Sequence, residues 1–526
     1  MILWASFLLF VASANEVGNA VCAQCHAAIA RTYAVTGMAR TAGAVTAETA
    51  IDGQFAHAAS GVQYRMVGED GGLSMQFSRS GSDWSGARRL EWFLGSGGLG
   101  RSYLFSLKGF LFQAPVSYYS SAKRWQISPG YERLPRMDLT RPVESACLQC
   151  HASRLQPVTG TQNGFDNPPF QEAGVSCERC HGPGQAHVEA MRRGAKPGAA
   201  IVNPAKLPAE ARDSVCAQCH LTGAARVARR NIATARYQPG AKLSDTLAVF
   251  VWPQVDGSPD ATSHYERLNQ SACKKAAGDR LWCGSCHEPH SSPADAVAHY
   301  RAKCQNCHAS RGCTEKAVVR KARGEDCASC HMPKGESHMV EHVAFTDHGI
   351  VRKVQPSPAT RGARELLSFF AASDDRDLAL GYAVTAMTEP AVRRRALELL
   401  EAAAARDAND VAVLAQLAQF RERMGRADLA EPLYRRILAV DANHSAAAVN
   451  LGIAHIKRGE TAQAIALWQR ALSRNPAQTG ARTNLAVALA QSGNLADAEA
   501  ALLKALEHDP DAEAPRRLLE EIRARR

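Results

Sequence analysis

Seven copies of a short pattern, Cys-x-x-Cys-His, are spread along this 526-residue chain and use 14 of its 16 cysteines. Two thiols separated by two residues and followed directly by an imidazole can hold haem c. The thiols add to the two vinyl groups of one porphyrin, and the histidine binds the iron as its proximal ligand. The sequence therefore predicts seven covalently attached haem c groups. The cysteine pairs are Cys22 and Cys25, Cys147 and Cys150, Cys177 and Cys180, Cys216 and Cys219, Cys283 and Cys286, Cys304 and Cys307, and Cys327 and Cys330. The histidines that follow them are His26, His151, His181, His220, His287, His308 and His331.

Two other kinds of site also use paired cysteines. A thioredoxin-type redox pair lies in a βαβ pattern and does not recur along a chain. A zinc site needs a second paired half at regular spacing, without a histidine after every pair. Seven intact copies, each with its histidine, fit haem attachment better than either alternative.

The second axial position of each iron is expected to come mostly from the remaining histidines. Eleven lie outside the motifs, and three of these (His444, His455 and His508) belong to the C-terminal part, where we interpret them as surface residues. Eight remain near the motifs, against seven irons, so most of them are predicted to bind iron. For each one the alternative is an ordinary structural histidine. The eight are His57, His187, His264, His290, His299, His338, His342 and His348.

A lone methionine, Met38, follows His26 by twelve residues, a separation that allows the chain to return over the iron. Methionine is an axial ligand in cytochromes c, and it raises the reduction potential relative to a second histidine. The hypothesis is that the first haem has His26 and Met38 as its two ligands. The alternative is an ordinary methionine in the hydrophobic core.

A long insert separates the first motif from the other six. From about Ile51 to Leu134 the sequence alternates between apolar and polar residues, is rich in aromatics and is interrupted by Gly, Pro, Asp and Ser, which is typical of strands and turns. Gly95 to Gly100 formally matches the nucleotide-binding pattern G-x-G-x-x-G, but the residues that follow favour a strand instead of the required helix. We therefore expect a small antiparallel subdomain without a nucleotide site.

The C-terminal part contains no haem motif and repeats with a period of 34 residues. Gly425, Gly459 and Gly493 keep this spacing, as do Leu417, Leu451 and Leu485, and Ala430, Ala464 and Ala498. The period is that of the tetratricopeptide repeat, a pair of helices that stacks on its neighbours into a solenoid with a concave groove. In the clearest unit, small residues are predicted to let Trp468 fill the space between two helices. Such a groove usually binds a peptide or protein segment, and the alternative is a structural extension or a self-association surface.

The resulting fold class is mainly α. It combines a multihaem cytochrome c domain of short helices and loops, carrying a small antiparallel β insert, with an all-α solenoid of tetratricopeptide repeats. The predicted divisions are a signal peptide at residues 1–14, a first haem segment at 15–50, the β-rich insert at 51–140, a six-haem cluster at 141–355 and the repeat domain at 361–526, with clear repeats at 411–444, 445–478 and 479–512. A linker is expected near residues 356–360, where the sequence reads PSPAT.

The N-terminal sequence and the net charge indicate where the protein is located and what it binds. Ile2 to Val11 form a short apolar run before Ala12-Ser13-Ala14, which predicts cleavage of a secretory signal before Asn15. No segment reaches the roughly 18 uninterrupted apolar residues of a membrane span, so we expect no transmembrane anchor. The formal charge of +11 comes without a nucleic-acid motif, and pairing with haem propionates explains part of it. The chain is expected to be periplasmic or otherwise exported from a bacterium, and to bind no nucleic acid.

Two cysteines stand outside the motifs, Cys273 and Cys313. In an oxidising compartment they could form a disulfide. The alternative is two separate thiols.

Four stretches resemble a known group of proteins: VCAQCHAAIARTYAVTGMART, GVSCERCHGPGQAHV, YERLNQSACKKAAGDRLWCGSCHEPH and CASCHMPKGESHMVEHVAFTDHGI. They are similar to periplasmic multihaem cytochromes related to the tetrahaem electron carriers of nitrifiers and to the hydroxylamine-oxidoreductase-like lineage, in particular variants with a tetratricopeptide tail. The resemblance covers roughly Val21 to Ile350. It implies that His187, His264, His290, His342 and His348 are distal ligands, with Met38 at the first haem. His57 fits the same set, which leaves His299 and His338 unused.

The function expected from this sequence is electron transfer along a haem chain, with redox partner proteins and a partner bound by the repeat groove. A second possibility is an oxidoreductase that acts on a small nitrogen or sulfur compound at one five-coordinate haem, as some members of the group have an open iron. The lysine-bearing C-x-x-C-K motif of pentahaem nitrite reductases is absent from the sequence. A third possibility is a scaffold in which the repeats organise a larger respiratory complex.

Overall fold

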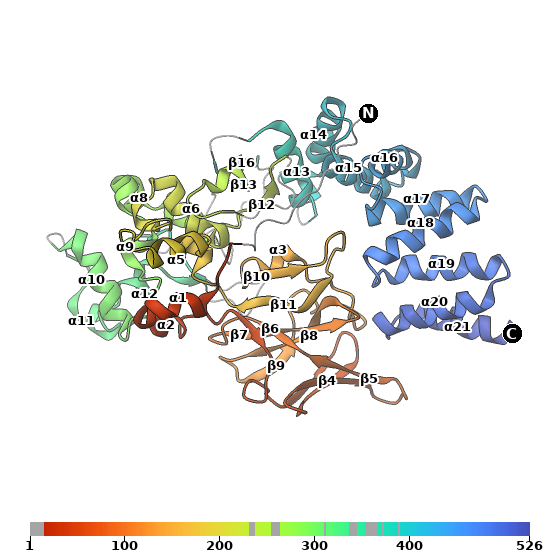
Figure 1. The fold of residues 1–526 in the computed structure, drawn as a ribbon, viewed down its shortest axis with the longest axis horizontal. Helices are drawn as coiled ribbons and strands as arrows, with labels where there is room; N and C mark the ends of the chain where they lie inside the picture. The colour runs from red at the N-terminus through yellow and green to blue at the C-terminus, as the bar shows by residue number, and fades with distance from the viewer. Residues whose placement is uncertain are drawn as a thin grey trace.

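The computed structural model describes residues 15–230, 237–253, 263–309, 312–335, 345–352, 365–370, 373–387 and 390–525. The predicted signal peptide, the predicted linker, His338 and His342 lie outside the described residues. Three parts can be followed in Figure 1: a group of short helices that contains α8 to α12, a β-rich part that contains β1 to β9, and an arc of helices from α13 to α21 on the opposite side from α8 to α12.

Two antiparallel sheets of the β-rich part share one hydrophobic core. Side chains from both sheets, among them Tyr64, Phe77, Phe105 and Phe112, are buried together in it. The first sheet has the order β1 (Ala42–Ala44), β6 (Trp92–Leu94), β7 (Gly100–Leu107), β8 (Phe110–Tyr119), β9 (Arg124–Ile127). The second has the order β2 (Gly53–His57), β3 (Val62–Glu69), β4 (Gly72–Arg79), β5 (Ser85–Leu90).

Local sequence explains these strands. In β3, Val62, Tyr64 and Met66 are buried while the residues between them are exposed, as expected for a strand with one face on a core. Asp70 and Gly71 form the two-residue loop to β4, with φ angles of 49° and 71°. Positive φ at both positions is the type I′ geometry that suits the twist of a hairpin, and Asp-Gly is a preferred pair for it.

The β content is larger than the small insert expected from the sequence. Nine strands lie between Ala42 and Ile127, and further strands lie within the predicted six-haem segment and, for the last one, at the start of the predicted all-α repeat domain. The latter are β10 (Ala152–Pro157) with β11 (Phe165–Ala173), β12 (Ala225–Ala228) with β13 (Leu247–Val251) and β16 (Leu367–Ser368), and β14 (Lys334–Gly335) with β15 (Phe345–Thr346). The pairs β10–β11, β12–β13 and β14–β15 join strands that are neighbours along the chain, whereas β16 pairs with the more distant β13.

Each Cys-x-x-Cys-His motif lies within or beside a short helix. The motif helices are α1 (Asn19–Cys25), α3 (Ser145–Leu148), α4 (Glu178–His181), α6 (Ala209–His220), α9 (Cys283–Cys286), α10 (Ala296–His308) and α12 (Cys327–His331). The remaining helices of this part are α2 (Ala27–Tyr33), α5 (Gln185–Arg192), α7 (His264–Gln270), α8 (Ala272–Ala277) and α11 (Ala317–Ala322). Both α6 and α10 end at the motif histidine, as the sequence predicts.

Paired helices form the C-terminal arc, and each predicted repeat contains one pair. The helices are α13 (Asp375–Thr385), α14 (Arg393–Arg406), α15 (Val411–Arg423), α16 (Ala427–Val440), α17 (Ser445–Lys457), α18 (Thr461–Arg474), α19 (Thr479–Gln491), α20 (Leu495–His508) and α21 (Glu513–Arg525). A Cβ added at Gly452 would lie 2.5 Å from Nε1 of Trp468, which is 2% exposed. The absence of a side chain at Gly452 therefore lets Trp468 fill the space between α17 and α18, as predicted.

The start of the arc is fixed to the sheet β12–β13–β16. Helix α13 packs against this sheet, and a Cβ at Gly381 would lie 2.6 Å from the ring of Phe250. The Arg229 guanidinium donates to the buried Asp377 carboxylate at 2.7 Å. We call this contact the first clamp.

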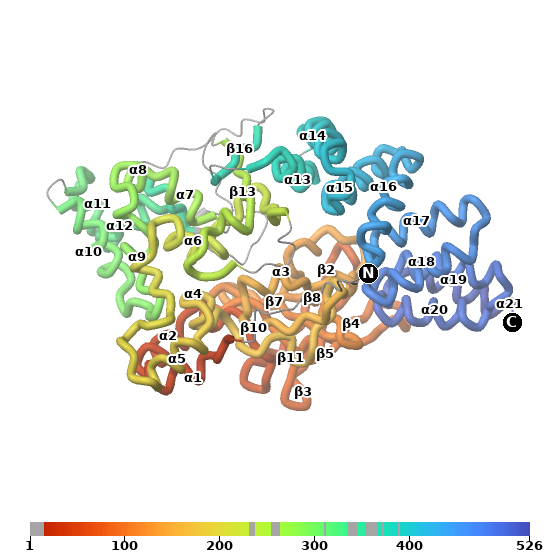
Figure 2. Tube along the Cα trace, turned by 45° about the horizontal axis from the view of Figure 1, so that its top comes forward, coloured from red at the N-terminus to blue at the C-terminus, as the bar shows by residue number. Residues whose placement is uncertain are grey.

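The end of the arc is fixed to the β-rich part by residues 507–511, which are the end of α20 and the loop after it. We call this contact the second clamp. Arg79 of β4 donates to both carboxylate oxygens of Asp511, at 3.0 and 2.8 Å. Arg136 donates to Asp509 at 2.7 Å, and the Trp84 indole donates to the Pro510 carbonyl. The repeat domain is therefore held at both ends (Figure 2). In the part of the chain that the structure describes, no helix combines the length and the apolar character needed to cross a bilayer.

We predict that Asp511→Ala weakens the second clamp by about 2–4 kcal/mol, because the 4%-exposed carboxylate satisfies Arg79 and also the Met137 amide at 2.9 Å. Hydrogen exchange of α20 and α21 amides measures this free energy of local opening. The control is Asp428→Ala, which removes an exposed partner of Arg426 and should change it by less than about 0.5 kcal/mol. Equal effects of the two substitutions would contradict a docking role for Asp511.

Candidate functional site

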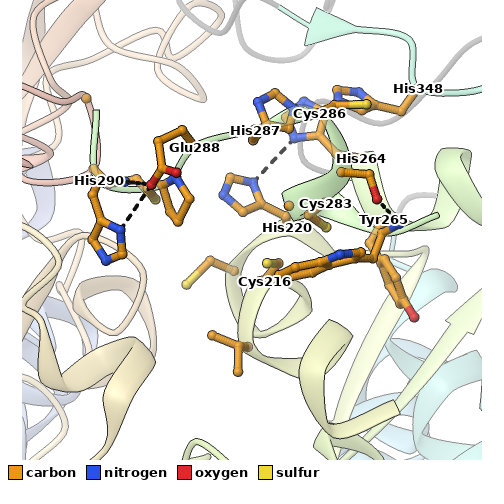
Figure 3. A pocket seen from close by; sticks show the side chains of 18 of the residues that line it. Cys216, His220, His264, Tyr265, Cys283, Cys286, His287, Glu288, His290 and His348 are labelled. Carbon is orange, nitrogen blue, oxygen red and sulfur yellow. Dashed lines mark hydrogen bonds and ion pairs between the residues drawn. The ribbon is translucent and has the colours of Figure 1, made fainter. Parts of the chain in front are cut away.

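All seven motifs line one continuous cavity of about 4690 Å³, and each contributes both cysteines and its histidine to the wall. Sites for single small molecules have volumes of roughly 300–1,000 Å³. The cavity is thus several times larger than a site for one ligand. Figure 3 shows one region of it, with Cys216, Cys283 and Cys286 beside a group of histidines.

Three motif histidines face a second histidine ring across the cavity. The ring centres of His26 and His187 are 6.4 Å apart, those of His181 and His290 are 5.8 Å apart, and those of His287 and His348 are 6.2 Å apart. The first two pairs are nearly parallel, with interplanar angles of 18° and 15°.

These separations fit one metal ion between each pair of rings. Atoms in direct contact would lie roughly 3.5–4 Å apart. Two imidazole nitrogens bound to opposite sides of one ion lie about 4 Å apart, which places the ring centres roughly 6 Å apart. The pairs therefore have the spacing expected of two axial ligands on one haem iron.

The fourth motif histidine lies in a tighter group. His264 has its ring centre 5.4 Å from that of His220 and 4.7 Å from that of His348. The Nδ1 atoms of His220 and His264 are 3.3 Å apart, so this pair is closer than the other three. Figure 3 shows these rings with His287 at one end of the region, while His290 lies apart from them.

Hydrogen bonds fix the orientation of several cavity histidines. The Nδ1 atoms of His181, His187, His331 and His348 each lie 2.8 Å from a backbone carbonyl oxygen, those of Val202, Ala199, Val351 and Thr346 respectively. A carbonyl only accepts, so Nδ1 carries the proton and Nε2 keeps its lone pair. Metal-bound histidines usually have their other ring nitrogen engaged in this way.

Burial keeps several histidines of the cavity neutral. Desolvation lowers the pKa of His264 to about 3 and that of His287 to about 4, and neighbouring histidines contribute to both shifts. Desolvation also lowers the pKa of His181, His220 and His348. Only the neutral imidazole can bind a metal, so these side chains are in the competent state at neutral pH.

The residues between the paired cysteines connect one motif to another. Arg179, inside the third motif, donates to the carbonyl of Gln149 in the second motif at 2.7 Å. Gln218, inside the fourth motif, donates to the carbonyl of Arg179 at 3.0 Å. Sequence reasoning treated these positions as spacers. The buried state of Arg179 and Gln218 has no signal in the sequence apart from their place between cysteines.

Glu178, also inside the third motif, holds the first motif in place. Its buried carboxylate accepts from the amides of Val17, Gly18 and Gly184, at 2.8, 2.9 and 2.7 Å. The Asn19 side chain accepts from the Cys177 amide at 2.9 Å. These bonds bring together two motifs that are about 150 residues apart in sequence.

The β-rich part supplies one wall of the cavity. The glycine-rich loop lines it with Gly95, Ser96, Gly98 and Gly100. The Gly95 amide donates to the Thr41 carbonyl at 2.7 Å, and the Thr41 hydroxyl lies 2.9 Å from Nδ1 of His151. Sequence reasoning excluded this loop as a nucleotide site and assigned it no other role, whereas the structure places it beside the second motif.

Of two further predicted distal ligands, one lies away from the cavity and one lines it. His57 lies in β2, away from the cavity wall, and its ring nitrogens contact the Ser60 hydroxyl at 2.8 Å and the Glu132 carbonyl at 2.9 Å. Both nitrogens are therefore used within the β-rich part. Met38 lines the cavity, and the ring that faces His26 belongs to His187, so the assignment of Met38 to the first haem stays a prediction with His187 as the alternative ligand.

The remaining candidates have mixed outcomes. His187, His264, His290 and His348 line the cavity, as the resemblance implies, and His299 does not. Among the described residues, no histidine ring is paired with His151, His308 or His331, while His338 and His342 lie outside them. Cys273 and Cys313 both line the cavity as free thiols and form no disulfide with each other.

Comparison with known proteins identifies two segments. Residues 120–182 match the family described as cytochrome c554 and c-prime, and residues 449–513 match the tetratricopeptide repeat. The first segment contains the second and third motifs. The chain thus has a multihaem cytochrome c part with haem c as its cofactor, and a tetratricopeptide repeat.

Relatives of known type cover only parts of the chain. The multihaem cytochrome MtrA of Shewanella baltica is 27% identical over 212 residues, which are 39% of this chain and 57% of that protein. The polyhaem cytochrome OmcB of Geobacter sulfurreducens is 28% identical over 160 residues, 28% of this chain and 20% of that protein. This chain therefore spans little more than half of one relative and a fifth of the other.

Solved structures similar to this chain include MamA of Desulfovibrio magneticus, with 21% identity, a TM-score of 0.27 and coverage of 30% of this chain and 87% of that one. The tetratricopeptide protein YrrB has 18% identity, a TM-score of 0.25 and coverage of 28% and 74%.

We predict that His187→Met raises one reduction potential of the holoprotein, because methionine in place of histidine raises the potential of a haem. Met38→Leu and His57→Gln should leave every potential unchanged, since His187 is the ring that faces His26 and both ring nitrogens of His57 contact the β-rich part. A spectroelectrochemical titration of the three variants measures this. A shift produced by Met38→Leu, with none produced by His187→Met, would favour the first assignment.

Proposed function

We propose that this chain is an exported electron carrier with seven haem c groups, attached through the seven motifs and arranged as a connected chain. One observation carries the proposal: all seven motifs line a single cavity. Separate sites would isolate the haems, whereas one shared cavity brings them together. When bound, each haem supplies an iron that accepts and releases one electron.

Contacts between cysteines of different motifs support an order for the haems. Cysteines of different motifs lie close enough that one shifts the pKa of the other in the pairs Cys22 and Cys177, Cys150 and Cys219, Cys216 and Cys283, and Cys304 and Cys327. Helix α4 packs on α6, and α10 packs on α9 and α12. These contacts give the series of motifs one, three, four, five, six and seven, with motif two beside motif four.

The protein contributes ligands, burial and fixed geometry to this chain. We propose His26 with His187, His181 with His290, and His287 with His348 as axial pairs, and His264 as the partner of His220. The hydrogen bonds to Nδ1 hold the rings of His181, His187 and His348 in place whether the iron is oxidised or reduced. Such preorganisation reduces the rearrangement that accompanies each electron transfer.

Export and partner binding complete the proposal. The predicted signal peptide supports an exported location. The tetratricopeptide repeat supports binding of another protein, because solenoids of this type present an extended concave surface. MtrA and OmcB are named as multihaem and polyhaem cytochromes, which agrees with several haems in one chain.

A second function is favoured at the second motif. Within the described part of the chain no histidine ring pairs with His151, His308 or His331, and at the second motif small residues of the loop Gly95–Gly100 also form the nearby wall. A haem there with an open axial position would bind a small nitrogen or sulfur compound. Carbon monoxide binding to one haem of the reduced protein distinguishes this oxidoreductase from a carrier in which all irons have two ligands.

The haem count tests the main proposal. We predict seven haems per chain by the pyridine haemochrome assay, for protein made in a host competent for cytochrome maturation. The double variant Cys147→Ser/Cys150→Ser should hold six, because its second motif can no longer form thioether bonds. The matched control is Cys273→Ser, which alters a cavity cysteine outside the motifs and should keep seven. Loss of a haem in the control, or a count below seven in the unaltered chain, would contradict the proposal.

A further inference from the structure

The last two motifs lie at one end of the molecule, on α10 and α12, with α11 beside them (Figures 1 and 2). In the proposed series they are the terminal pair, linked to the rest through the contact of α10 with α9. The motif residues Cys307 and His308 are exposed, whereas the third motif has its connecting residues Glu178 and Arg179 buried. This end of the haem series is therefore open to solvent, as is the other end, where Cys25 and His26 are exposed.

Residues 316–323, which contain helix α11, have one face on the cavity and one face on the solvent. Val319, Arg320 and Arg323 line the cavity. Lys316, Val318 and Lys321 are exposed and do not line it, and Val318 is 71% exposed. We call Lys316, Val318 and Lys321 the α11 face.

The charge around this face is strongly positive. Residues 296–309 and 312–335 contain seven Lys and Arg against three Asp and Glu. All three acidic side chains already have partners, because Glu325 pairs with Arg320, Asp326 accepts from the Ala328 amide and Glu315 accepts from the Lys316 amide. Lys316 and Lys321 form no ion pair with the part of the chain that is described.

Haem propionates do not account for these two lysines. A propionate belongs to a group inside the cavity, and its partners must line the cavity, as Arg320 and Arg323 do. Lys316 and Lys321 point elsewhere, on either side of an exposed valine. An exposed apolar side chain flanked by charges of one sign is typical of a protein-binding surface. The charges select partners of the opposite charge.

We propose that the α11 face is the docking surface for an acidic one-electron redox protein, which exchanges electrons with the terminal haems. This inference rests on the electron-carrier function proposed above. In each encounter one electron leaves the reduced partner and one ferric haem iron becomes ferrous, or the reverse. The lysines steer the partner, and Val318 supplies the apolar contact at the centre.

The test is the rate of reduction of the holoprotein by an acidic flavodoxin, measured by stopped flow. The flavin hydroquinone loses one electron to a ferric haem and becomes the semiquinone. The rate for the unaltered chain should fall steeply with ionic strength, because charge steering raises association rates by 10–10³-fold at low salt. Lys316→Glu/Lys321→Glu should lower the low-salt rate at least about tenfold, and Lys316→Gln/Lys321→Gln should give an intermediate rate.

Matched controls separate docking from other effects. Lys457→Glu/Lys504→Glu makes the same change of net charge on exposed residues of the repeat domain and should keep the unaltered rate. Reduction by dithionite, which needs no docking surface, should be equal in all variants. Equal slowing by both double substitutions, or no slowing by either, would overturn the proposal.

Two further results distinguish the docking surface from a membrane-binding surface and from a failure of the electron-carrier function. Tight binding to phosphatidylglycerol vesicles that is lost in Lys316→Glu/Lys321→Glu, with an unchanged flavodoxin rate, would overturn the proposal in favour of a membrane surface. If dithionite reduces no haem in the unaltered chain, the electron-carrier function itself fails, and the docking surface fails with it. If dithionite reduces all variants and flavodoxin shows no preference, only the docking surface fails.

Discussion

The separation between facing imidazole rings is the constraint on which the rest of this structure depends. One iron can bind two histidines only if their nitrogens lie about 4 Å apart on opposite sides. Three pairs of rings have their centres 5.8–6.4 Å apart, although the two members of each pair come from different helices or loops. The carbonyls that accept from Nδ1, the helix contacts and the bonds made by Glu178 and Arg179 all maintain this spacing.

The sequence predicts the attachment sites well because they are local. Two cysteines and a histidine within five residues specify one haem with little dependence on the rest of the chain, and the cytochrome c554 match covers the second and third of these motifs. The repeats are local too, so the helix pairs and the close fit of Trp468 on Gly452 are confirmed. Distal ligands are a different problem, because they must be brought from elsewhere by the fold. His187, His290 and His348 face motif histidines as the resemblance implies, whereas the assignment of Met38, which used spacing, stays a prediction.

The errors and omissions share one physical cause, which is contact between residues distant in sequence. The side chain of His57 is of a type that binds iron. Strand pairing nevertheless places it in β2, where Ser60 and Glu132 use both ring nitrogens. Glu178 and Gln218 gave no signal because a buried polar residue is recognised only by its partners. The β-rich part was foreseen as an insert, and its role as a wall of the cavity depends on the Thr41 contact with His151.

Fixing the repeat domain at both ends changes how it can come apart. A free solenoid frays from its last unit inward, because that unit has a neighbour on one side only. Here the final loop is anchored by Arg79 and Arg136, and the initial helix by Arg229. Fraying from either tip is suppressed, so the least protected helices should be those midway along the arc, near α16 and α17. The helices between the two fixed ends are therefore the part of the array where the curvature can change most.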